Sequence, residues 1–164
     1  MRPAARRWIK RLTVLAVALA LLVLLGLEAM RFVAARHGVE TVPLPEGSEI
    51  EARSAEADYA DAYRSPLPDP EVSLESLAHR ASPARLLVAE AADEVVYEGR
   101  APGLRYLVSL VLDRRGETVY LTLSTAVFYE SPLGLAYFTT VKVGHRRLVP
   151  YALYRLVEDL PSSP

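Results

Sequence analysis

Few side chains of this chain could carry out chemistry, and His145 is the best placed of them. An imidazole titrates near neutral pH, so it could act as a general base or hydrogen-bond a ligand. A structural hydrogen bond near Pro150 is the more ordinary role, and we favour it. No two of the three histidines stand three or four residues apart and the chain has no cysteine, so the sequence predicts no metal site.

Other kinds of catalytic site have as little support. Asp58 and Asp61 are three residues apart, which puts them on opposite faces of a strand, so they do not form a carboxylate pair. No serine lies in a Gly-x-Ser-x-Gly context, and no glycine-rich phosphate loop is present. The sequence therefore names no catalytic residue and no cofactor.

A binding pocket needs only a few polar groups among apolar ones. Arg105 could bind a carboxylate or a lipid phosphate, although a surface ion pair with the acidic body is the commoner role. Tyrosines could line such a pocket or could equally form plain core, which we favour. The candidate ligand-binding residues are His145, Arg105, Tyr106, Tyr120 and Tyr137.

An uncharged apolar stretch over residues 12–27 decides where these residues work. A membrane-spanning helix needs roughly 17–25 mostly apolar residues, a length that is reached if Glu28 lies at the interface and the helix continues to Ala35. A cleaved signal peptide is a weaker interpretation, because no good cleavage site follows the stretch. A buried helix of a soluble protein is weaker still, since the stretch has no polar face. We expect residues 1–36 to be a basic segment and a membrane anchor.

The orientation of the anchor follows from its flanking charges. Five basic residues precede the apolar stretch, whereas two, Arg31 and Arg36, follow it closely. An excess of positive charge before a membrane helix favours a cytoplasmic N-terminus. We therefore expect a single-pass protein of the cytoplasmic (inner) membrane with its C-terminal domain outside.

The net charge differs between the two parts of the chain. Residues 1–36 carry seven basic and one acidic residue, a net charge of +6, whereas residues 37–164 carry 12 basic and 19 acidic residues, a net charge of −7. An acidic body argues against a nucleic-acid partner, because phosphate binding needs a basic surface. We expect the lipid bilayer as a partner, and an apolar small molecule, a lipid or a protein of the cell envelope stays open as another.

Composition divides the rest of the chain into three parts. Residues 37–57 combine prolines, a glycine and acidic residues without sustained periodicity, which is typical of a linker. Residues 58–160 are long enough for one small domain with one core. Residues 161–164 form a polar tail that we expect to be disordered.

The clearest elements of the domain are two strands over residues 104–113 and 117–130. They are rich in Val, Leu, Thr and Tyr and meet at Arg114-Arg115-Gly116, which predicts a β-hairpin. Alternation puts Tyr106 and Leu110 on one face of the first strand. Shorter elements are expected before the hairpin: strands over 58–63, 85–91 and 94–98, and a helix over 73–81.

From Pro132 to Leu160 apolar residues recur at steps of three and four, which predicts a long helix. Ser131 is its expected N-cap, and Pro150 should kink or split it. The expected apolar face is Leu133, Tyr137, Val141, Gly144, Leu148, Ala152 and Leu156. The sequence thus predicts an α+β fold in which a small curved antiparallel sheet packs on a long C-terminal helix.

Four stretches follow one another in an order that resembles a bacterial family of uncharacterised domains. They are DYADAYRSPL at 58–67, the hairpin at 104–129, SPLGLAYF at 131–138 and GHRRLVP at 144–150. The family is domain of unknown function 2867, and the resemblance covers most of residues 58–157. The Leu-Gly-x-x-Tyr spacing followed by His-Arg is its most specific part.

This resemblance implies a helix-grip fold of the START/polyketide-cyclase type, in which an apolar ligand often lies between the sheet and the C-terminal helix. The family has no established activity. Some members of the family resemble appendages to NAD-binding domains. This chain departs from the family pattern in carrying an apolar N-terminal helix, in lacking an NAD-binding segment, and in having Val143-Gly144 where the family tends to have Pro-Phe.

Together these observations predict a membrane-anchored, non-catalytic domain that binds a small apolar or amphipathic ligand or an envelope partner. A cyclase- or isomerase-like enzyme that uses His145 is the first alternative. A structural interaction protein of the cell envelope is the second. A continuous cavity between hairpin and helix would favour a ligand over a structural role.

Overall fold

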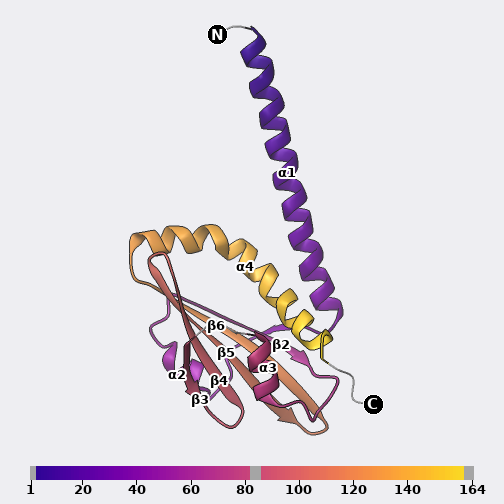
Figure 1. Cartoon of the computed structure of the whole chain (residues 1–164), viewed down its shortest axis with the longest axis vertical. Coiled ribbons are helices and arrows are strands. Elements are labelled where there is room, and N and C mark those ends of the chain that lie inside the picture. Colours follow the sequence, from indigo (N-terminus) through magenta and orange to yellow (C-terminus); the bar gives the residue numbers. More distant parts are fainter. Residues whose placement is uncertain (1–2, 82–85, 161–164) are drawn as a thin grey trace.

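A computed structural model describes residues 3–81 and 86–160 and joins a long N-terminal helix to an α+β body (Figure 1). The helices are α1 (Pro3–Arg36), α2 (Glu49–Arg53), α3 (Leu74–Ala81) and α4 (Pro132–Glu158). The strands are β1 (Glu40–Val42), β2 (Tyr59–Pro66), β3 (Leu86–Glu90), β4 (Glu94–Ala101), β5 (Leu104–Arg115) and β6 (Thr118–Tyr129). The predicted α+β fold is confirmed. Arg85 of the expected strand over 85–91 and the expected tail 161–164 lie outside the described residues.

The strands form one antiparallel sheet in the order β1-β2-β6-β5-β4-β3. The predicted hairpin is confirmed as β5 and β6, with Leu112 opposite Leu121. Its turn contains Gly116 at a φ of 62°, a backbone conformation that favours glycine. Because side chains alternate between the faces of a sheet, this register decides which residues of the hairpin face α4.

Each face of the sheet has its own apolar core. On one face, α4 and α3 cover the sheet, and fully buried Leu153 and Leu77 pack with Leu121. On the opposite face, Ile50 of α2 packs with Leu107 and with other small and branched side chains of the sheet. The sheet is therefore covered on both sides, which explains why neither face of the hairpin strands is cleanly polar.

The expected linker over residues 37–57 is structured, and that prediction is wrong. It contributes β1, which pairs with β2 at one edge of the sheet, and α2, which buries Ile50 completely. The backbone N–H groups of Glu49 and Ile50 donate to the buried carboxylate of Glu94, at 2.6 and 3.1 Å. The prolines and glycine of this segment separate two short elements, so they mark turns within the fold.

The long helix α4 runs without a break through Pro150, so the proline does not split it. Ser131 is its N-cap, as predicted, and its hydroxyl accepts a hydrogen bond from the N–H of Gly134 at 3.4 Å. The buried face differs from the predicted one, because Phe138 and Leu153 are buried while Leu148 is 46% exposed. α4 has apolar residues on several sides, so its sequence is compatible with more than one buried face.

The helix α1 touches the body only through its C-terminal end. Ala34 is fully buried, and the ring of His37 lies 4.5 Å from that of Tyr154 on α4, centroid to centroid. The preceding segment stands clear of the body in Figure 1, and its large apolar side chains are exposed. The span Leu12–Arg36, with a mean hydropathy of 2.5, is long and apolar enough to cross a membrane.

Candidate functional site

A cavity of about 680 Å³ lies between α4 and the face of the sheet that this helix crosses. Small-molecule sites in proteins have volumes of roughly 300–1,000 Å³, so the cavity is of a suitable size. Its wall is mainly aliphatic and aromatic. The side chains that form the wall include Leu104, Tyr106, Val108, Leu110, Leu123, Thr125, Val127, Phe138, Val141, His145 and Val149.

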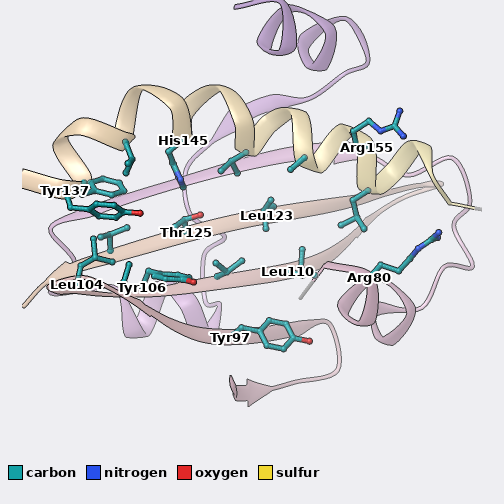
Figure 2. A pocket seen from close by; sticks show the side chains of 18 of the residues that line it. Arg80, Tyr97, Leu104, Tyr106, Leu110, Leu123, Thr125, Tyr137, His145 and Arg155 are labelled. Atoms are coloured by element: carbon teal, nitrogen blue, oxygen red, sulfur yellow. The ribbon is translucent and has the colours of Figure 1, made fainter. Parts of the chain in front are cut away.

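The two ends of the cavity differ in polarity (Figure 2). Tyr137, Leu104 and Tyr106 lie at one end, and Arg80 of α3 and Arg155 of α4 lie at the other. The guanidinium of Arg155 also forms ion pairs with neighbouring carboxylates of α4, at 2.9 and 3.1 Å. The cavity therefore combines an apolar interior with a charged end, where Arg80, Arg155 and Asp159 lie, a distribution that suits an amphipathic molecule.

The floor of the cavity depends on a close approach between Tyr106 and Gly99. The two residues are opposite each other on β5 and β4. A Cβ atom at Gly99 would lie 2.3 Å from Cζ of the tyrosine ring, so only glycine leaves room for the ring in this position. This explains locally how Tyr106 comes to lie across the sheet as part of the cavity wall.

A cluster of polar side chains borders the cavity around Asp61, whose side chain is only 10% exposed. The hydroxyl of Tyr59 donates to Oδ2 of Asp61 at 2.5 Å, and the hydroxyl of Tyr63 donates to the same oxygen at 3.0 Å. Nε2 of His145 lies 3.3 Å from Oδ1. One carboxylate thus joins β2 to a histidine of α4 that lines the cavity.

The electrostatics of the cluster keep both tyrosines protonated. Burial, together with the hydrogen bond to Asp61, raises the pKa of Tyr59 to about 12. Burial and the negative charge of Asp61 raise the pKa of Tyr63 well above its ordinary value. Arg146 donates from Nε to the hydroxyl oxygen of Tyr59 at 3.3 Å. At neutral pH the tyrosines are hydrogen-bond donors, and neither is suited to act as a base.

This arrangement leaves His145 as the group of the cluster best suited to contact a ligand. A carboxylate that hydrogen-bonds one nitrogen of an imidazole fixes the orientation of the ring. The imidazole then has its second nitrogen for a hydrogen bond. It could orient a polar group of a ligand, or it could accept a proton from one.

Of the predicted ligand-binding residues, the structure brings His145, Tyr106 and Tyr137 together around the cavity. It does not bring Arg105 and Tyr120 there. Both point to the opposite face of the sheet. Side chains alternate between the two faces along a strand, and each of these residues lies an odd number of positions from the residues of its strand that line the cavity.

The side chains of Arg105 and Tyr120 have other contacts on that face. The guanidinium of Arg105 lies 3.9 Å from the centroid of the Phe128 ring and 3.5 Å from a carboxylate oxygen of Glu98. The Tyr120 ring lies under the guanidinium of Arg64, at 4.9 Å. Arg105 therefore has the ion-paired role that the sequence favoured for it.

Sequence reasoning missed Asp61, which it considered only as a partner of Asp58. The signal that could have found it is the spacing Tyr59-x-Asp61-x-Tyr63, which puts two tyrosines and a carboxylate on one face of a strand. The contact with His145 has no such signal, because it depends on how α4 lies across the sheet. Among the residues that the structure describes, no three His, Asp or Glu side chains gather as a metal site would require.

Comparisons with known proteins leave the function open. No family model and no curated protein matches the chain. Among solved structures, the crystal structure of CalU16 from Micromonospora echinospora is similar over 74% of this chain and 90% of that chain, with 11% sequence identity and a TM-score of 0.32. A similarity at this level carries no argument about function, so a functional proposal must depend on the geometry of the site itself.

Proposed function

We propose that this chain is a membrane-anchored, non-catalytic protein whose α+β body binds a small apolar or amphipathic molecule between α4 and the sheet. The observation that carries the proposal is the cavity of about 680 Å³ with its mainly apolar wall. A few polar groups, among them His145 and Arg155, border it at defined places. Such a combination binds the apolar part of a ligand by burial and orients it by a small number of hydrogen bonds.

The membrane part of the proposal rests on α1 and its flanking charges. The helix is long and apolar enough to span a bilayer, and five basic residues precede its apolar stretch. On the positive-inside rule the N-terminus lies in the cytoplasm and the body outside the inner membrane. A reporter enzyme fused after Pro164 tests this orientation, since activity confined to the cytoplasm would contradict it. A mature N-terminus near residue 36 would show instead that the helix is cleaved.

The relation to the family of domain of unknown function 2867 is also a proposal. It is supported by the four sequence stretches between residues 58 and 150 and by the position of His145 next to the cavity. An envelope partner that simply packs against the body is less well supported, because a purely structural role gives no reason for a cavity of this size.

Native mass spectrometry of the full chain, purified in detergent from expressing cells, tests ligand binding. The full chain is needed because Ala34 and Val39 belong to the core of the body, so removal of α1 would expose it. We expect a bound small molecule that survives removal of the detergent. Val141→Trp, which fills the cavity, should lose it, whereas Ala52→Trp on the exposed surface of α2 should keep it. The same adduct on both variants, or on neither, would refute the proposal.

An isomerase- or cyclase-like enzyme is the second candidate, and the pair of Asp61 and His145 favours it. A carboxylate 3.3 Å from an imidazole that lines a cavity is a common arrangement for a general base. His145→Gln separates the two candidates once a co-purified compound is known. A binding protein should lose affinity without any conversion of the compound, whereas an enzyme should retain the compound and cease to convert it.

A further inference from the structure

The C-terminal end of α1 is fixed to one side of α4. Arg147 forms an ion pair with Glu28, and the Tyr154 ring packs against the tilted His37 ring with centroids 4.5 Å apart. Arg147 and Tyr154 are seven residues apart, so they share the side of α4 that is turned away from the sheet. The contact therefore sets the position of α4 relative to the apolar helix.

The same side of α4 continues beyond this contact toward its N-terminus. Steps of four and three from Arg147 reach Val143, Thr140, Ala136 and Leu133, which we call the outer stripe of α4. Leu133 is 62% exposed and Val143 47% exposed. The hydroxyl of Thr140 donates to the carbonyl of Ala136 at 3.0 Å, so its hydrogen-bonding capacity is partly used within the helix. From Pro132 to Val141 the helix has no charged residue.

Glu28 shows at which height along α1 the outer stripe of α4 lies. This is the first charged residue after the apolar stretch 12–27, so it marks where a membrane-spanning α1 leaves the hydrocarbon. Arg147 lies at that level because it pairs with Glu28. In Figure 1 the N-terminal half of α4 runs across the direction of α1. It lies on the side of the sheet that is nearer to the N-terminal part of α1.

We propose that the outer stripe of α4 lies in the interface of the same bilayer that α1 spans, with the N-terminal half of α4 parallel to the membrane surface. The inference rests on the membrane anchoring proposed above. Exposed Leu and Val on an uncharged helix face gain free energy at the boundary of headgroups and acyl chains. Residues 37–164 carry a net charge of −7, and the outer stripe brings none of that charge to the membrane surface.

The arrangement has a consequence for the cavity. Tyr137 lies on the N-terminal half of α4 and lines the apolar end of the cavity. With the outer stripe on the membrane, this end lies next to the bilayer and the end with Arg80 and Arg155 lies farther from it. An amphipathic molecule would thus have its apolar part nearest to the lipid.

Site-directed spin labelling of the full chain tests the inference, and the absence of native cysteines makes single labels simple to introduce. The labelled variants are Leu133→Cys and Val143→Cys on the outer stripe, Leu22→Cys on α1, and Glu117→Cys in the β5–β6 turn as the water-exposed control. All four side chains are exposed, so a label at any of them leaves the core unchanged. Each variant is reconstituted into vesicles of phosphatidylethanolamine and phosphatidylglycerol. Power saturation then compares collisions with oxygen, which partitions into lipid, and with a water-soluble nickel chelate.

We expect the labels at Leu133 and Val143 to favour oxygen, at a shallower depth than the label at Leu22, while the label at Glu117 favours nickel. If Leu133 and Val143 behave like Glu117 while Leu22 favours oxygen, the inference is overturned and the anchor stands. If Leu22 itself favours nickel, α1 does not span the bilayer, and the anchoring proposal fails together with the inference.

Discussion

Asp61 of β2 and His145 of α4 lie 3.3 Å apart between Oδ1 and Nε2, although 84 residues separate them in the sequence. Their side chains are only 10% and 18% exposed. Because Tyr59 and Tyr63 donate to the other oxygen of the same carboxylate, one anion connects three further side chains at the border of the cavity. The position of the middle of α4 above the sheet therefore depends in part on this carboxylate.

Replacement of Asp61 by Asn should destabilise the body. The amide can accept fewer hydrogen bonds and brings no negative charge, so at least one buried partner loses its acceptor. We expect the free energy of unfolding to fall by about 1–3 kcal/mol in urea denaturation. Asp113→Asn is the matched control, because its carboxylate pairs with Arg115 near the exposed end of the hairpin, and it should change stability by less than about 0.5 kcal/mol. Equal effects of the two substitutions would contradict the role given to Asp61.

Stability should fall as the pH rises above the ordinary tyrosine pKa of 10.0. In the unfolded chain Tyr59 loses its proton near that value, whereas in the folded chain burial and the hydrogen bond to Asp61 raise its pKa to about 12. Between these values the unfolded state binds fewer protons, so the free energy of unfolding decreases with increasing pH. Urea denaturation over this range measures the slope.

The variant Tyr59→Phe supplies the control for this pH dependence. It removes one of the two groups with a strongly raised pKa, so its stability should decrease less steeply with pH than that of the native chain. An identical slope would mean that Tyr59 titrates in the folded state as it does in the unfolded one. Tyr63, whose pKa is raised as well, should account for part of the remaining slope.

Much of the fold follows from patterns that are local in sequence. The hairpin of β5 and β6 was predictable because alternation and the turn glycine Gly116 act over neighbouring residues, although Arg114 and Arg115, expected in the turn, pair within the strands. The N-cap of α4 at Ser131 is local for the same reason. The buried face of α4 was not predictable, because Leu148 and Phe138 are equally apolar and only the position of the sheet decides which is covered.

The candidate site was predictable only in part. Tyr106 and His145 were among the predicted residues and line the cavity. The polar cluster, however, needs the pairing of β2 with β6, which brings an N-terminal strand beside the C-terminal helix. The burial of Ile50 could not be predicted from the sequence either. A five-residue helix has too few residues to show a period, so its apolar residue gave no signal of burial.

The start of α4 should be intolerant of any side chain at Gly134. A Cβ atom there would lie 1.9 Å from the carbonyl oxygen of Gly103, and the clash is with backbone, which cannot move aside as a side chain can. We expect Gly134→Ala to lower the free energy of unfolding by about 1–3 kcal/mol. Gly144→Ala on the same helix is the control, since the nearest atom to its Cβ is a Leu148 methyl at 4.0 Å. That substitution should stabilise the helix by about 0.5–1 kcal/mol.

Thermal unfolding of the two glycine variants decides whether the close approach exists. Opposite shifts of the melting temperature are expected, because one substitution meets backbone and the other meets ordinary van der Waals contact. If Gly134→Ala is as stable as the native chain, α4 does not begin against the turn that contains Gly103. The end of the cavity near the N-terminus of α4 would then differ from the one described.

Ser109 and Ser124 are opposite each other on β5 and β6, both are fully buried, and they should respond to alanine in opposite directions. The hydroxyl of Ser109 donates to the buried carboxylate of Glu94 at 2.6 Å. The Oγ atom of Ser124 has no hydrogen-bond partner within the described parts of the chain. A buried hydroxyl without a partner costs free energy, whereas a hydrogen bond to a carboxylate contributes it.

Ser124→Ala should therefore raise the free energy of unfolding by about 1 kcal/mol, and Ser109→Ala should lower it by about 1.5–3 kcal/mol. Urea denaturation of both variants measures the difference, and their nearly equal side-chain volumes rule out a packing effect as its main cause. A loss of stability in Ser124→Ala as large as that in Ser109→Ala would show that the Ser124 hydroxyl is paired in the native protein.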